Sequence, residues 1–138
     1  MAVTIEDAGT GIKELIDDIT ALKQVFAPNE LPLMVNLFPC ALVIPGAVNY
    51  LETIGGGSSV TFRILVLLAP IDSKVGMDTV LPFIEKSGTN SIPAKIKTDP
   101  TLGGRGYAAI VRSCSGITQT NWGTGNYLTA EFEVLVRL

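Results

Sequence analysis

Few side chains in this sequence have the types and spacing that catalysis requires. The chain has no histidine, the commonest general base and metal ligand in proteins. Glu131 and Glu133 form a carboxylate pair that could carry out acid–base chemistry, but they share one face of a predicted strand with no evident cleft around them. We therefore predict a solvated carboxylate pair, with Arg63 as a partner across the sheet.

The two cysteines, Cys40 and Cys114, also lack a chemical partner. They lie far apart in the chain and match no metal-binding or redox spacing. No histidine is present to activate either thiol as a nucleophile. We predict two buried, reduced thiols, although the sequence alone leaves a disulfide between them open.

Two glycine-rich runs resemble phosphate-binding loops only in composition. Such a loop needs a helix after it and usually a lysine, whereas a predicted strand follows both Gly55–Ser59 and Gly103–Gly106. The first run is better explained as the turn of a β-hairpin. We therefore expect no cofactor, no metal and no enzymatic activity.

The composition indicates surplus apolar surface. Apolar residues make up 47% of the 138 residues and charged residues only 17%, with a net charge of −3. Soluble domains usually carry about 25% charged residues, so we expect either a dense core or a surface that a partner covers. The acidic balance argues against a dedicated nucleic-acid binder. No apolar run approaches the ~20 residues of a membrane helix, and the N-terminus lacks the pattern of a secretory signal.

The predicted elements are organised around one strand, Ser58–Leu68. Its odd-numbered positions are apolar from Val60 to Leu68, and Leu65 and Leu67 make the second half apolar on both faces. Such a strand must be covered on both sides, so it is predicted to be central in a sheet.

Helical spacing precedes this strand. Thr4, with Asp7 three residues later, predicts a helix start, and an apolar stripe continues to Phe26 until Pro28 ends the helix. Pro32 and Pro39 restrict Leu31–Leu37 to an edge strand or an extended connector. Two strands are then predicted, Cys40–Ile44 and Ala47–Ile54, with Pro45-Gly46 between them.

The second half adds one helix and two strands. A short helix is predicted over Thr79–Lys86, with Val80, Leu81 and Ile84 turned inward. Thr89–Gly106 is irregular and either functional or the site of a short helix. The remaining predictions are, in order, a strand at Tyr107–Ser115, a mobile connection at Gly116–Gly125 carrying Trp122, and a strand at Tyr127–Leu138.

These elements predict a single domain, residues 1–138, of the α+β class. Its sheet is mostly antiparallel with about five strands and two helices, in the order α-β-β-β-α-β-β.

One segment also suggests a family. Phe38–Tyr50, with its Phe-Pro, strand, Gly-Ala, strand order, resembles the corresponding part of tail terminator proteins of long-tailed bacteriophages. The resemblance extends to the Gly-rich turn, the strand that ends at Leu68-Ala69-Pro70, the helix after Asp78 and the closing amphipathic strand. Head–tail joining proteins have the same layout.

The resemblance implies a structural protein of the virion, assembled in the host cytoplasm. Six copies would form a ring on the head-proximal end of the tail tube, stop its polymerisation and join the head connector. DNA would pass through the lumen without sequence-specific contacts. Partners would then be further copies of the chain, the tail tube protein and the head connector protein, with no membrane.

In such a ring we expect contacts at the sheet edges and hairpin tips, because an open edge can pair with another subunit. Trp122 either folds back onto the sheet or anchors a partner. The candidate interface residues are Glu52, Ile54, Gly56, Ser58, Leu65, Leu67 and Trp122.

Two other hypotheses remain open at this point. A head–tail connector or tail tube subunit would use the same sheet, and a tube subunit would form open-ended polymers. A small-molecule-binding α+β domain, with Thr89–Gly106 as a lid, would require a defined apolar pocket.

Overall fold

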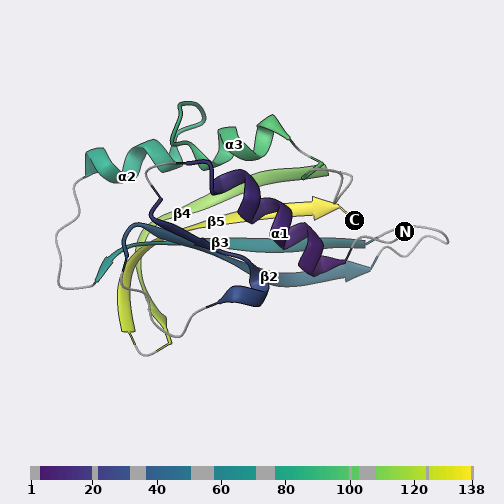
Figure 1. Ribbon diagram of the computed structural model, residues 1–138, viewed down its shortest axis with the longest axis horizontal. Coiled ribbons are helices and arrows are strands. Elements are labelled where there is room, and N and C mark those ends of the chain that lie inside the picture. The colour runs from purple at the N-terminus through teal and green to yellow at the C-terminus, as the bar shows by residue number, and fades with distance from the viewer. Residues whose placement is uncertain are drawn as a thin grey trace.

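A five-stranded sheet carries all three α-helices on one face (Figure 1). The computed structural model describes residues 4–19, 22–31, 37–50, 58–70, 77–99, 101–102, 108–123 and 125–137. Its elements are α1 (Ile5–Ile16), β1 (Gln24–Phe26), the 3-10 helix η1 (Pro28–Glu30), β2 (Cys40–Tyr50), β3 (Ser58–Pro70), α2 (Met77–Ile84), α3 (Ile92–Thr98), β4 (Ala108–Trp122) and β5 (Gly125–Arg137).

The strand order β1-β2-β3-β5-β4 places β3 at the centre, as its two apolar faces predict. Neighbouring strands are antiparallel except for β1, which pairs parallel with Cys40–Leu42 of β2. The predicted α+β class and mostly antiparallel sheet are therefore confirmed. The third helix, α3, lies inside the predicted irregular stretch, where the Ser91 hydroxyl caps it by accepting from the Ala94 amide at 3.1 Å.

Helix α1 begins as predicted and ends earlier. The Thr4 hydroxyl accepts from the Asp7 amide at 3.0 Å, and the Asp7 carboxylate accepts from the Thr4 amide at 3.4 Å, which completes a capping box. The helix then stops at Ile16, so its predicted extension to Pro28 is wrong. Leu22 and Phe26 fit helical spacing, but the chain between them forms β1 because its backbone groups pair with β2.

Two strands are longer than predicted because each absorbs a break as a β-bulge. The predicted strands Cys40–Ile44 and Ala47–Ile54 form one strand, β2, up to Tyr50, and its register shifts between Pro45 and Val48; residues 51–54 lie outside the described residues. The predicted mobile connection after Ser115 is largely part of β4, whose register shifts between Cys114 and Ile117. A bulge admits one extra residue and bends the strand instead of ending it.

The main hydrophobic core lies between the sheet and the helices. Alternate residues of β3 and β5 point into it, and they meet apolar residues of α1 and α3 and Phe83 of α2. Phe83 takes the buried position in α2, whereas Leu81, predicted to face inward, is 43% exposed. On the helix-covered face, β3 contributes Val60, Phe62, Ile64, Val66 and Leu68.

A second hydrophobic cluster lies on the helix-free face, where none of the described α-helices packs. Leu65 and Leu67 are 1% and 0% exposed there, packed with Cys40, Leu42 and Tyr127. The end of the β4–β5 hairpin bends away from the helices, and Trp122 and Tyr127 at that end pack in this cluster (Figure 1). The interface hypothesis for Leu65 and Leu67 required them to be exposed, and the chain buries both by itself.

Gly9 of α1 permits a close approach that a larger side chain would prevent. A Cβ atom there would lie 2.4 Å from Cγ of Pro28 and 3.1 Å from Cε1 of Phe62. We expect Gly9→Val to lower the free energy of unfolding by about 1–3 kcal/mol, because α1 would have to move away from a rigid ring. Urea denaturation followed by circular dichroism measures this loss.

The matched control for Gly9 is Glu6→Val, which puts the same side chain on an exposed position of α1. It should cost less than about 1 kcal/mol, through helix propensity and the lost interaction with the helix N-terminus. Equal losses in the two variants would contradict the packing explanation.

Candidate functional site

The helix-free face of the sheet has two different halves. One half is the second hydrophobic cluster, and the other is an open polar groove of about 300 Å³. Four strands supply the lining of the groove: Gly46, Ala47, Thr61, Arg63, Ser113, Ser115, Glu131 and Glu133.

The floor of the groove depends on the bulge in β2. Pro45 pairs with Phe62 and Val48 with Val60, so Gly46 and Ala47 both lie opposite Thr61. A Cβ atom on Gly46 would lie 2.5 Å from the carbonyl oxygen of Thr61. Glycine is thus required for β2 to approach β3 at this point.

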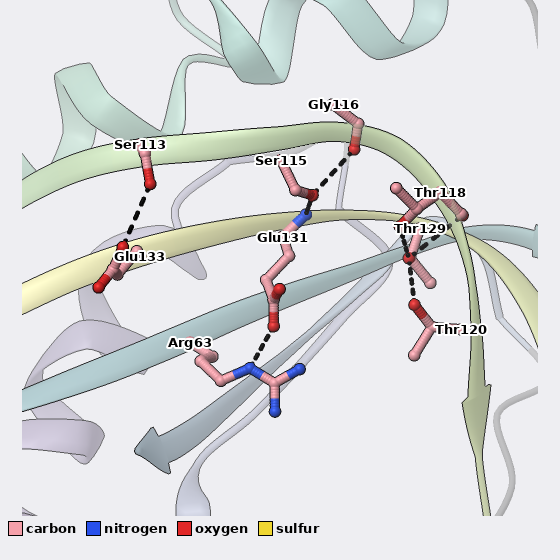
Figure 2. Close-up of polar contacts among 9 residues, drawn as sticks. All are labelled: Arg63, Ser113, Ser115, Gly116, Thr118, Thr120, Thr129, Glu131 and Glu133. Carbon is pink, nitrogen blue, oxygen red and sulfur yellow. Dashed lines mark hydrogen bonds and ion pairs between the residues drawn. The ribbon is translucent and has the colours of Figure 1, made fainter. Parts of the chain in front are cut away.

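The charged groups of the groove are paired with one another. Nε of Arg63 donates to Oε1 of Glu131 (Figure 2), one of the two glutamates for which Arg63 was the predicted cross-strand partner. The Ser113 hydroxyl donates to Oε2 of Glu133 at 3.3 Å, and Nη1 of Arg112 lies 3.7 Å from Oε1 of the same carboxylate. Both ion pairs are partly exposed, so each is expected to contribute no more than about 1 kcal/mol to stability.

Hydroxyl groups continue this polar network along β4 (Figure 2). Ser115 accepts from the Glu131 amide at 3.2 Å and donates to the Gly116 carbonyl at 3.1 Å. Thr129 alternates with Glu131 and Glu133 on the strand face predicted to be solvated, yet it is fully buried, and its hydroxyl lies 2.8 Å from that of Thr120. The arrangement offers hydroxyls and paired charges to a binding partner.

The cysteines are free thiols, and the predicted burial holds for Cys40 but only in part for Cys114. Both Cys40 and Cys114 are free, with Cys40 buried and Cys114 half-buried. Burial raises the pKa of the Cys40 thiol to about 12, and burial also raises the pKa of Cys114. Neither thiol is thereby activated as a nucleophile. Within the described ranges, no three histidine, cysteine, aspartate or glutamate side chains gather as a metal site would require.

The outer edge of β4 is a second surface suited to a partner. In the part of the chain that the structure describes, β4 pairs only with β5, which leaves the other edge of a 15-residue strand open. Two of the large exposed hydrophobic side chains lie on this strand, Ile117 and Ile110, and Ile110 is 60% exposed. Open edges with apolar side chains are typical sites of strand pairing between chains.

The opposite side of the sheet is open over part of its length. The short strand β1 covers only Cys40–Leu42 of β2, and no other described strand pairs with β2 on that side. Beyond it the edge continues to Tyr50, whose side chain is 81% exposed. The sheet therefore presents two different open edges, each with a large apolar or aromatic side chain.

The residues predicted as interface candidates lie in different parts of the structure. Glu52, Ile54 and Gly56 lie outside the described residues. Ser58 is the first residue of β3, half-buried and paired with Tyr50. Trp122 ends β4 and packs against the second hydrophobic cluster, which agrees with the first of its two alternatives, folding back onto the sheet.

The exposed residues Tyr50, Ile110 and Ile117 were not among the sequence candidates. The sequence predicts a loop at Ile117. It predicts strands at Tyr50 and Ile110, but it does not predict that these strands lie at the edges of the sheet. Alternation in a strand predicts which face a residue occupies, but it does not predict which strand lies at the edge.

No family model matches the chain, and no curated protein matches it significantly. Of the helices in the described ranges, none has the length and apolar character needed to span a membrane.

Proposed function

We propose that this protein is a structural subunit that closes into a ring, and that the ring is the tail terminator of a long-tailed bacteriophage. The observation that carries the proposal is the pair of different open edges on one sheet, β4 on one side and the end of β2 on the other. Two unlike edges allow head-to-tail contacts, which generate closed rings or open filaments.

The fold is compatible with the family resemblance on which the finer proposal rests. In Phe38–Tyr50 the Gly46-Ala47 pair forms a bulge within one strand, β2, instead of separating two strands, and the long strand β3, the helices α2 and α3, and the strands β4 and β5 follow. By that resemblance, six copies cap the tail tube, bind the head connector and leave a lumen through which DNA passes.

Mass and tube-capping measurements test this function. Native mass spectrometry of the purified protein should give one closed oligomer, six copies by the resemblance. Added to polymerising tail tube protein, it should bind tube ends and shorten the tubes seen by electron microscopy. A chain that stays monomeric at micromolar concentration and leaves tube length unchanged would rule the proposal out.

The same experiments separate the related functions. A tail tube subunit would form open-ended polymers by itself, and a head–tail connector would bind purified heads in preference to tubes. The remaining hypothesis, a small-molecule-binding domain, predicts instead that a ligand raises the melting temperature of the protein, as thermal denaturation would show.

A further inference from the structure

We propose that β4 of one copy pairs antiparallel with the outer edge of β2 in the next copy, so that one sheet continues through the assembly. This inference rests on the proposed ring and names the joint that builds it. The occupant of each open edge is thus a second copy of this chain.

Strand direction makes this pairing compatible with the rest of the fold. β2 is antiparallel to β3, β3 to β5 and β5 to β4, so β4 and β2 run in opposite directions. When the next copy continues the sheet in the same orientation, its β2 therefore lies antiparallel to this copy's β4. The helices of all copies then lie on the same side of the extended sheet.

The usable segments of the two edges lie at the same level of the sheet. Val48 pairs with Val60, Val60 with Val136, and Val136 with Ala109, so Val48 and Ala109 belong to one row across the sheet. Each edge is regular at this level: 48–50 follows the bulge of β2, and 108–111 precedes the first bulge of β4. Joining the edges without stagger places Val48 beside Ala109 and Asn49 beside Ala108, and it places Ile110 opposite the bulge of the next copy's β2.

The other end of the sheet is unsuited to the joint. There β1 occupies the edge of β2 at Cys40–Leu42, and Pro45 offers no amide hydrogen for pairing. The joint is therefore confined to the end at which Ile110 and Tyr50 are exposed.

The two exposed side chains support the joint from opposite faces. Ile110 pairs with Leu135, which pairs with Thr61 of the polar groove, so Ile110 lies on the helix-free face. Tyr50 is two residues from Val48, which packs against the main core, so Tyr50 lies on the helix-covered face. A joined pair of edges would therefore bring Ile110 of one copy next to the β2 bulge of the next on the helix-free face, and Tyr50 next to the start of β4 on the helix-covered face.

Two single-edge variants test the joint. Ile110→Lys places a charge on the β4 edge and Tyr50→Lys places one on the β2 edge, and a charged edge strand resists pairing with another chain. Because both positions are exposed, each variant should keep the circular dichroism spectrum of the parent protein and a melting temperature within a few degrees of it. Native mass spectrometry should show that each variant alone has lost the ring and is monomeric. Mixed in equal amounts, the two should form a one-to-one dimer and nothing larger, because each dimer contains one intact joint.

Other outcomes would overturn the inference. If Tyr50→Lys alone forms dimers, like edges pair by a two-fold axis. If both variants keep the parent ring, the joint lies elsewhere although the proposed function stands, whereas a monomeric parent protein removes the proposed function itself. Leu81→Lys, on the exposed side of α2, is the matched control and should keep the ring; its dissociation would place the contact on the helix layer.

Discussion

Replacing Leu67 with aspartate should unfold the protein. Leu67 is fully buried in the second hydrophobic cluster, beside Leu65, Cys40 and Tyr127. The change removes apolar contacts and places a carboxylate where no partner or water can reach it, a combination that costs about 4–5 kcal/mol or more. Since single domains are stable by only about 5–15 kcal/mol, the variant should be largely unfolded or aggregated at room temperature.

Urea denaturation followed by fluorescence measures this effect, because Trp122 packs against the same cluster and is the only tryptophan of the chain. Ile110→Asp is the matched control, since it introduces the same charge at an apolar position of the sheet that is 60% exposed. It should keep the free energy of unfolding within about 1 kcal/mol of the parent value and lose assembly instead. Natively folded Leu67→Asp rings would show that Leu67 belongs to neither the core nor a contact.

Alkaline pH should destabilise the protein through Cys40. Burial raises the pKa of this thiol from 9.0 to about 12, and a backbone hydrogen bond at Leu67 opposes the shift only in part. Between these two values the unfolded chain loses the thiol proton while the folded chain retains it, so the free energy of unfolding falls as the pH rises. The fall is about 1.4 kcal/mol per pH unit and on the order of 4 kcal/mol across the window, and below pH 9 the contribution is constant.

A comparison with Cys40→Ala isolates this contribution. Urea denaturation at pH 8, 9, 10 and 11 should show the parent protein losing stability more steeply than the variant above pH 9, while both retain Cys114 and the tyrosines. The alanine variant starts from a lower stability because it removes buried sulfur, so only the slopes are compared. Parallel curves above pH 9 would show that Cys40 ionises as readily in the folded state as in the unfolded chain.

The second hydrophobic cluster explains why Leu65 and Leu67 could not be assigned from sequence. Leu65 and Leu67 lie on the strand face opposite the main core, so other apolar groups must cover them. From the sequence, either a helix or another subunit could do so. The structure uses a third cover, the bent end of the β4–β5 hairpin with Tyr127, together with residues near the start of β2 such as Phe38, whose ring centroid lies 5.7 Å from that of Tyr127. Such a cover depends on the bend of the sheet, which apolar patterning does not encode.

The boundaries that were wrong have a common cause. A residue pattern reports local preference. On that basis the sequence predicts a helix at Leu22–Phe26, the end of a strand at Pro45–Gly46 and a loop at Gly116. In each case pairing with a distant strand decided the outcome: β2 draws the first segment into a parallel edge, and β3 and β5 hold the other two as bulges. Pairing energy that comes from far along the chain overrides local preference.

What the sequence alone determined was the inventory: the capped first helix, the central strand with two apolar faces, the α+β class and the lack of histidine. Each follows from residue type and short-range periodicity, which are properties of neighbours in the chain. Only the tertiary structure decided which edges stay open and that Ile110 and Tyr50 are exposed on them, because strand order and sheet bending are set by contacts between residues far apart in sequence.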